Sequence, residues 1–197
     1  CAQWQKAGRQ VSVSVNLSAR DLLQADLPER FCAMLERHGC AAGWITLEIT
    51  ESAVLDDPGK ALANLERLRA TGCQLSIDDY GTGYSSLSYV RQMPVQEMKI
   101  DRSFIMNLLT QPDDEIIVRS TIELAHNMGL VVTAEGVESE AVLQRLGALG
   151  CDLAQGYFIG RPMAAADLAG WMDDSPWACA GHHRHVADKA SLLALGV

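Results

Sequence analysis

The sequence has no apolar stretch near the ~20 consecutive residues that a transmembrane helix needs. Its N-terminus also lacks the pattern of a secretory signal peptide. No low-complexity linker divides the 197 residues, and 48% of them are hydrophobic, which is enough for one sizeable core. These absences argue against a membrane-spanning or secreted chain, so we expect a cytoplasmic globular domain.

Positive charge is scarce. Lysine and arginine total 16 residues against 25 aspartates and glutamates, which gives a net charge of −9. An acidic surface repels the phosphate backbone, so we expect no DNA or RNA polymer as a partner. A small phosphate ester could still bind if cations or local basic residues offset this charge.

Paired CxxC cysteines are absent. The six cysteines are scattered, and several lie in apolar runs, where a thiol behaves as a small hydrophobe. They are Cys1, Cys32, Cys40, Cys73, Cys151 and Cys179. We expect reduced, largely buried thiols rather than disulfides, as in a cytosolic protein.

What the sequence does contain is a sixfold alternation of strands and helices. Apolar or β-branched runs predict strands at residues 11–16, 44–51, 73–78, 97–101, 130–135 and 152–155. Apolar residues at helical spacing predict helices near 28–39, 57–72, 85–94, 113–129 and 139–150, and a last helix that includes Leu168 and Trp171. Such alternation is typical of an α/β fold with parallel strands, which form either a closed barrel or an open sheet.

We assign residues 1–173 to one domain and 174–197 to a loosely ordered C-terminal tail. The chain opens on what looks like the end of a helix, stopped by Gly8. Three histidines within residues 182–185 could bind a metal ion, but a solvated tail is the alternative that we favour.

The stretch IDDYGTGYSSL, residues 77–87, places two acids side by side where a predicted strand ends. Successive strand side chains point to opposite faces, so we expect Asp78 and Asp79 to diverge. They would then flank a site for two ions rather than chelate one. The glycines that follow give the loop backbone freedom. The alternative is a surface turn with helix-capping acids.

Every predicted strand has polar residues at or near its carboxyl end. They are Asn16, Glu48, Asp78 with Asp79, Lys99 with Asp101, Glu135 and Gln155. In a βα barrel these strand ends converge on one mouth, where active sites lie. Each residue alone could be a cap or a turn former. Six successive strands that end this way favour a shared site.

Carboxylates and an amide oxygen, without cysteine or histidine, suit Mg²⁺ or Mn²⁺ better than zinc. Four or more acids at one mouth would repel one another unless cations lay between them. Two divalent ions about 3.5–4 Å apart can clamp the attacking and leaving oxygens of a phosphoryl displacement. Lys99 would add positive charge near the water or the phosphate; its alternative role is a salt bridge at a strand end.

Six sequence motifs, in family order from Trp4 to about Trp171, resemble the EAL domain family. They are NLSA at Asn16, LEITES at Glu48, DDYGTGYSSL at Asp78, MKIDRSF at Lys99, TAEGVES at Glu135 and QGYFIGRP at Gln155. The resemblance implies a bacterial signalling enzyme, a phosphodiesterase that hydrolyses cyclic di-GMP to linear pGpG and so acts on behaviours such as biofilm formation. It also implies a TIM-type (β/α) barrel, of which six of the eight βα units are present.

By this resemblance, two Mg²⁺ or Mn²⁺ ions serve the reaction, and Ca²⁺ is expected to inhibit it. Asn16, Glu48 and Asp78 would be ligands of the first metal. Asp79 would serve the second, with Asp101 close to the metals and the attacking water.

The resemblance also implies roles for residues that do not bind metal. Lys99 would assist the attacking water together with Glu135 and Gln155. Glu51 would anchor the DDYGTGYSS loop, and the 78–90 region would contribute to a homodimer contact.

Weaker assignments concern the substrate. Tyr84 and Tyr157 could contact a base, Glu138 could be an accessory acid, and Arg161 could bind substrate or help to close the barrel. Family members often carry a diguanylate cyclase or sensor domain upstream, and the parent protein could be anchored in a membrane.

One departure from the family pattern keeps a second function open. The Glu-Ala-Leu motif, whose glutamate is a metal ligand, is absent, and the nearest string, at residues 140–142, lies on a predicted helix. Two strands of a closed barrel are also missing, so we expect either a fragment or an incomplete barrel. The alternative function is a catalytically inactive domain that binds cyclic di-GMP or a protein partner. An unrelated metal-using barrel, such as an enolase-like one, fits the Asp-Asp loop and Asn16 less well.

Overall fold

The computed structural model describes residues 1–9, 11–82 and 87–177. The chain divides into two compact units, Cys1–Met98 and Lys99–Val197. The hydrogen-bonded order of the strands follows the chain from β1 to β6. The pairs β1–β2, β2–β3 and β5–β6 are parallel, as the alternation of strands and helices predicts.

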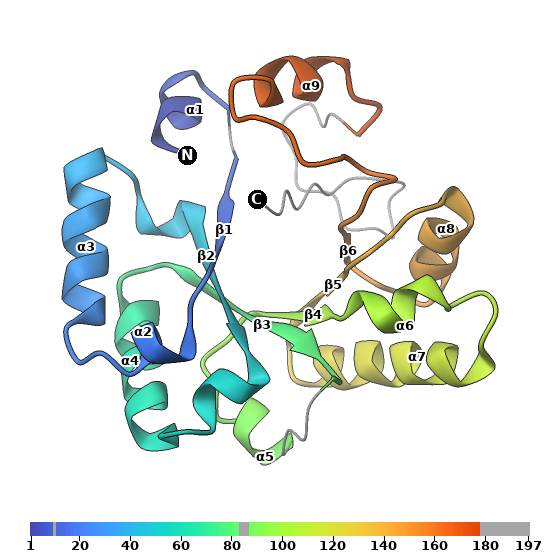
Figure 1. The fold of residues 1–197 in the computed structure, drawn as a ribbon, viewed down its shortest axis with the longest axis horizontal. Helices are drawn as coiled ribbons and strands as arrows, with labels where there is room; N and C mark the ends of the chain where they lie inside the picture. Colours follow the sequence, from blue (N-terminus) through green and yellow to red (C-terminus); the bar gives the residue numbers. More distant parts are fainter. Residues whose placement is uncertain (10, 83–86, 178–197) are drawn as a thin grey trace. The chain divides into compact units, whose positions relative to one another are not determined.

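The first unit carries three strands and the start of a fourth. Its strands are β1 (Val13–Asn16), β2 (Ile45–Thr50), β3 (Gln74–Tyr80) and the first half of β4 (Glu97–Ile100). Its helices are α1 (Ala2–Lys6), α2 (Ala19–Leu22), α3 (Leu27–His38), α4 (Pro58–Ala70) and α5 (Leu87–Val90), with 3₁₀ turns η1 (Ala42–Trp44) and η2 (Glu51–Val54). Helices α3 and α4 lie on the same side of β1–β3 (Figure 1).

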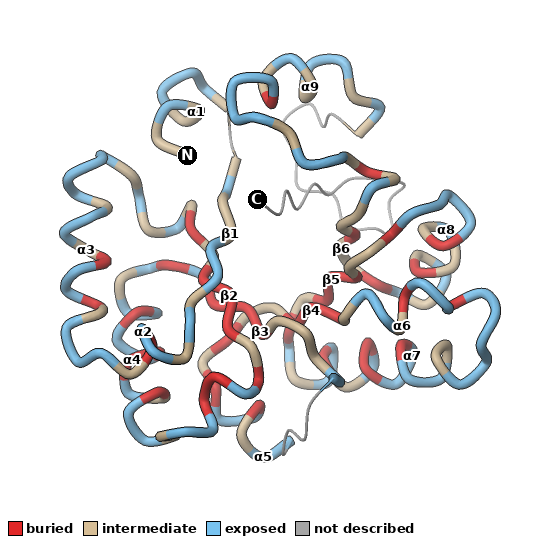
Figure 2. Tube along the Cα trace, in the orientation of Figure 1, coloured by how far each residue is buried: buried red, intermediate tan, exposed pale blue. Residues whose placement is uncertain are grey.

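Local sequence signals explain the two long helices of this unit. Helix α3 has Pro28 in its first turn and ends at Gly39, whose left-handed backbone (φ 60°) stops it. Helix α4 is capped by Asp57, whose side chain accepts the Lys60 N–H at 3.2 Å. Three consecutive residues are buried in β2 (Leu47 to Ile49) and in β3 (Leu75 to Ile77), so both faces of these strands are covered, and one face of α4 is buried as well. Figure 2 shows the buried segments along the strands.

The second unit continues β4 and adds β5 (Val131–Ala134) and β6 (Leu153–Ala154). Its helices are α6 (Arg102–Met106), α7 (Pro112–Asn127), α8 (Glu140–Ala148) and α9 (Leu168–Asp174). Arg145 of α8 reaches Glu115 of α7 through two hydrogen bonds, one of them 3.1 Å long, and Arg119 reaches the same carboxylate at 2.6 Å. This charge cluster ties α8 to the start of α7.

All six predicted strands are present, with ends that differ by a few residues. Strand β3 continues through Asp79 to Tyr80, beyond the predicted end at residue 78. Helices α2 and α6 were not predicted, because four or five residues are too few to show helical spacing. Their capping residues, Ser18 and Asp101, are the signals that could have revealed them.

Several predictions fall partly or wholly outside the described residues. The predicted helix 85–94 is reduced to α5, and residues 83–86, including Tyr84, are not described. The same holds for 178–197, which include Cys179 and the tail histidines. The five described cysteines are free, as expected, but only Cys73 and Cys151 are buried, whereas the other three are half-buried. Burial raises the pKa of the Cys151 thiol to about 12. Among the described helices, none combines the length and the apolar character that crossing a bilayer requires.

Candidate functional site

Three of the predicted metal ligands share one face of β1–β3 in the first unit. Asn16 on β1 is the register partner of Glu48 on β2, and Glu48 is in turn the partner of Ser76 on β3. Asp78 lies two residues beyond Ser76 and so points to the same face. Adjacent strands lie about 4.8 Å apart. The amide of Asn16 and the carboxylates of Glu48 and Asp78 therefore line one face near the strand ends.

The backbone around Asn16 is fixed on both sides of the strand end. The N–H of Leu17 donates to the Glu48 carbonyl at 2.8 Å, which extends the β1–β2 ladder beyond Asn16. Ser18 then caps α2 by accepting the Asp21 N–H at 3.1 Å.

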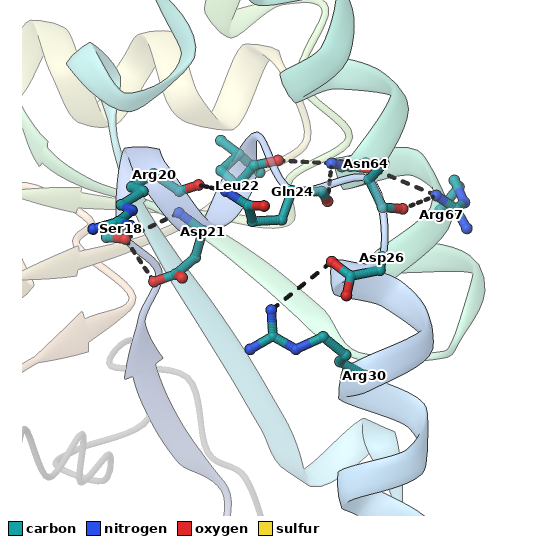
Figure 3. A network of polar contacts seen from close by, with 10 residues as sticks. Ser18, Arg20, Asp21, Leu22, Gln24, Asp26, Arg30, Asn64 and Arg67 are labelled. Atoms are coloured by element: carbon teal, nitrogen blue, oxygen red, sulfur yellow. Dashed lines mark hydrogen bonds and ion pairs between the residues drawn. The ribbon is translucent and has the colours of Figure 1, made fainter.

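Farther along, the buried Asn64 of α4 donates to the Leu22 and Gln24 carbonyls (Figure 3). The segment that follows the first predicted ligand is thus held against α4.

Asp79 corrects our prediction that the two adjacent acids diverge. One carboxylate oxygen of Asp78 and one of Asp79 lie within 4.8 Å of each other. The cause is the backbone of Asp79, which is left-handed (φ 54°), so the ordinary alternation of strand side chains breaks there. Thr82 stabilises this turn, because its N–H and its hydroxyl both donate to the Asp79 carbonyl, at 3.3 and 3.0 Å. Two close carboxylates can share or bridge cations.

Glu51 begins η2 directly after β2 and is buried, with 6% of its surface exposed. Its Oε1 accepts the Gly81 N–H at 2.8 Å, which links η2 to the loop that follows β3. Burial raises the pKa of the Glu51 carboxyl, although the Gly81 hydrogen bond opposes this. Burial, and then the charge of Glu51, raise the pKa of Tyr80. Within the described residues, Glu51 holds the start of the DDYGTGYSS loop.

In the second unit, Lys99 is buried on β4 with only 3% of its surface exposed. Its Nζ lies 2.6 Å from Glu135 Oε1, at the carboxyl end of β5. The Glu135 N–H donates to the Ile100 carbonyl at 3.1 Å, which continues the β4–β5 ladder to this residue. A buried ammonium is costly unless it is paired, so the ion pair with Glu135 offsets the burial of Lys99 and fixes its position. The salt bridge that we weighed as an alternative is therefore present and supplies a positioned cation.

Asp101 follows β4 and caps α6. Its Oδ1 accepts the Ser103 N–H at 2.9 Å and also a short hydrogen bond from the Ser103 hydroxyl. These contacts fix the orientation of the carboxylate. Ser103 was not among the predicted site residues, although the Asp-Arg-Ser spacing of a capping turn could have identified it.

Gln155, Tyr157 and Arg161 lie in the segment after β6, and Glu138 lies after β5. The Gln155 N–H donates to the Ala134 carbonyl at 2.8 Å, so the backbone of Gln155 extends the β5–β6 ladder. Tyr157 is exposed, and the Arg161 guanidinium carbon lies 4.7 Å from its ring centroid. Glu138 is exposed beside α8.

Comparison with known proteins identifies the family. Residues 1–162 match the family model of the EAL domain. The chain belongs to the EAL domain family. The predicted resemblance is thereby confirmed, and so is the fold class, because EAL domains are TIM-type (β/α) barrels.

Relatives and solved structures of this family resemble the chain over most of its length. MucR of Pseudomonas aeruginosa is a bifunctional diguanylate cyclase/cyclic di-GMP phosphodiesterase. It is 43% identical to this chain over 157 residues, which make up 80% of this chain and 23% of MucR. A solved complex of the PaMucR phosphodiesterase with cyclic di-GMP is 42% identical over 85% of this chain and 68% of that one, with a TM-score of 0.81. The EAL domain of Mycobacterium smegmatis DcpA is 36% identical over 88% of this chain and 79% of that one, with a TM-score of 0.83. Among the first curated relatives, the chain spans from 20% to 40% of their length.

Proposed function

We propose that this EAL chain is part of a cyclic di-GMP phosphodiesterase that hydrolyses its substrate to linear pGpG and so lowers the level of the second messenger. The observation that carries the proposal is the shared face of Asn16, Glu48 and Asp78 in the first unit. The phosphodiesterases among the family relatives support it. We place its action in the cytoplasm.

The donor set fits two divalent cations, Mg²⁺ or Mn²⁺. Asn16, Glu48 and Asp78 would hold the first ion through hard oxygen ligands, and Asp79 would hold the second, with Asp101 nearby. The close approach of Asp78 and Asp79 supports this assignment, because two adjacent carboxylates favour a cation between them. When bound, the two ions would activate water and neutralise the phosphate. Ca²⁺ would bind without supporting turnover.

The protein's own groups would orient the reactants. Lys99 would place a positive charge beside the incoming water or the phosphate, and its ion pair with Glu135 keeps the ammonium from moving away. Gln155 would add amide hydrogen bonds to the same water network. Glu51 would hold the loop after β3 and so keep Asp79 in place. The 78–90 region would contribute to a homodimer contact, and a cyclase or sensor domain would act upstream in a longer protein.

A second function competes with catalysis. The 197 residues contain no Glu-Ala-Leu motif, so the chain by itself would bind the first metal weakly and turn over little substrate. A domain that binds cyclic di-GMP or a protein partner without cleaving it is the alternative.

Both functions can be tested in one design. The full-length protein should hydrolyse cyclic di-GMP in Mg²⁺, as followed by chromatographic detection of pGpG. Asp78→Asn and Glu48→Gln should each lower kcat by at least about 100-fold, because each removes a negative ligand. Asp113→Asn, an exposed acid in the first turn of α7, is the matched control and should keep wild-type turnover.

Calorimetric titration of cyclic di-GMP in Ca²⁺ separates binding from cleavage. Binding without turnover in Mg²⁺ would establish the receptor alternative. If a folded full-length protein neither bound nor hydrolysed cyclic di-GMP, both the phosphodiesterase and the cyclic di-GMP receptor would be refuted, and only the protein-partner role would be left. Normal turnover by Asp78→Asn would refute the ligand assignment.

A further inference from the structure

Ser76 carries a fully buried hydroxyl on the face of the predicted metal ligands. It lies on β3 as the register partner of Glu48 on β2, two residues before Asp78. Its exposed surface is 0%, and within the described residues its Oγ has no hydrogen-bond partner. Buried hydroxyls are nearly always hydrogen-bonded, because an unpaired one loses its contacts with water and gains none in return. A residue that only filled space here would be less costly as alanine.

The surroundings of Ser76 on β2 and β3 differ between the two faces of the sheet. Leu75 and Ile77, on either side of it in the chain, are 0% exposed and point to the opposite face. On its own face, Ser76 has Glu48 across the ladder and Asp78 farther along the strand. Both neighbours are carboxyl groups, which only accept hydrogen bonds when they are ionised. The O–H of Ser76 is therefore a donor placed among acceptors.

Glu48 is the nearer of the two acceptors. Adjacent strands lie about 4.8 Å apart, whereas residues two positions apart along one strand are separated by about 6.6 Å. The Glu48 side chain is also buried, with 8% of its surface exposed, so water offers it few alternative donors. Carboxylates that bind metal ions are usually held by a further hydrogen bond, and loss of that bond typically weakens metal affinity by about 10- to 100-fold. A serine O–H can orient one carboxylate oxygen while the other binds the ion.

We propose that Ser76 is a positioning residue for the first cation, whose hydroxyl donates to the Glu48 carboxylate when that carboxylate holds the ion. The hydrogen bond fixes the orientation of the ligand and so raises the affinity of the site. This assignment rests on the proposed function, because it names a further residue of the same metal site. Ser76 acts through Glu48 and does not touch the substrate.

Binding of Mn²⁺ to the full-length protein, without substrate, tests this role. The EPR signal of the free ion reports how much Mn²⁺ is bound. Asp78→Asn removes a ligand and so defines the weak binding elsewhere on the acidic surface. Ser76→Ala should raise the Kd of the Asp78-dependent ion by about 10-fold. Ser14→Ala is the matched control, because it removes a half-buried hydroxyl from the same face of β1, two residues before Asn16, and should keep the wild-type Kd.

Stability in EDTA separates this role from a structural one. Ser76→Ala removes a buried hydroxyl that has no partner among the described residues, so its urea midpoint should equal or exceed that of wild type. With cyclic di-GMP as substrate, the same variant should need about 10-fold more Mg²⁺ for half-maximal turnover. A hydroxyl that served only the fold would change the urea midpoint and leave the metal affinity as it is.

Wild-type Mn²⁺ affinity in Ser76→Ala would overturn the proposal and leave the phosphodiesterase function intact. A lower urea midpoint of Ser76→Ala in EDTA, or an equal loss of Mn²⁺ affinity in Ser14→Ala, would also overturn it, because the effect would then come from the fold. If wild type bound Mn²⁺ no better than Asp78→Asn, the metal site itself, and with it the proposed function, would be refuted.

Discussion

The left-handed backbone of Asp79 brings two neighbouring carboxylates to within reach of each other. A non-glycine residue in this conformation carries a cost of roughly 1–2 kcal/mol. The two acids also repel each other when both are ionised. A cation between the carboxylates removes this repulsion, and its binding can offset the cost of the backbone torsion. We therefore interpret the torsion of Asp79 as part of the metal site rather than as an incidental turn.

Glu51 gives a prediction about pH. Because its pKa is raised above the ordinary 4.5, the folded state holds the Glu51 proton more tightly than the unfolded state does. The contribution of this group to stability is therefore present below pH 4.5 and is lost as the pH rises through the raised folded pKa. Glu51→Gln keeps an acceptor for the Gly81 N–H and never ionises. The variant should gain stability relative to wild type as the pH increases from 4 to 8.

Urea unfolding at several pH values measures this difference directly. Glu115→Gln is an informative comparison, because Arg145 and Arg119 lower the pKa of Glu115. The stability of this variant relative to wild type should therefore fall, not rise, as the pH increases. A constant difference between Glu51→Gln and wild type across the whole pH range would show that burial does not perturb Glu51.

The α2–α3 connection depends on one buried side chain. Asn64 is 5% exposed, and its amide donates to the Leu22 carbonyl at 2.7 Å and to the Gln24 carbonyl at 2.9 Å (Figure 3). Asn64→Ala would leave both carbonyls without this donor, so we expect a loss of about 2–3 kcal/mol in the free energy of unfolding. Asn64→Asp, which has the same shape but no donor, should lose at least as much. Chemical denaturation provides the measurement.

A neighbouring arginine on the same helix provides the control. Arg67 donates to the Ala25 carbonyl at 2.9 Å and pairs with Glu29, but its side chain is about half exposed. Arg67→Ala should therefore cost less than about 1 kcal/mol. If Arg67→Ala cost as much as Asn64→Ala, the connection would depend on surface charge rather than on the buried amide.

The elements differ in how well the sequence predicts them. Strands β1 to β6 and the longer helices follow from apolar periodicity together with proline and glycine at helix ends. Helices α2 and α6 do not, because a helix of one turn has no period to detect. The end of β3 was also missed, because the left-handed torsion of Asp79 depends on contacts made by Thr82 and Glu51 rather than on strand propensity.

For the whole molecule, the sequence identified the family and the positions of polar residues at strand ends. It could not give the pairing of Lys99 with Glu135, since that depends on which side chains meet when β4 and β5 align. It also gave no sign that Tyr157 and Arg161 touch, because a spacing of four residues in a loop has no fixed geometry. The family match establishes the fold, and the roles of the predicted site residues are our proposals.

With a net charge of −9, the chain can be stabilised by Mg²⁺ in two ways, through binding at a site or through screening of its acidic surface. If Asn16, Glu48 and Asp78 hold Mg²⁺ in the folded state only, the ion must raise stability, by about 1.4 kcal/mol at ten times its Kd. For a domain of this size that is a rise of about 3–6 °C in Tm. Asp78→Asn should lose this rise, while Asp113→Asn should keep it. Thermal unfolding is compared with NaCl at equal ionic strength, because screening alone also stabilises an acidic chain. An equal rise in NaCl, or in Asp78→Asn, would mean that Mg²⁺ only screens the surface and is not bound at the strand ends.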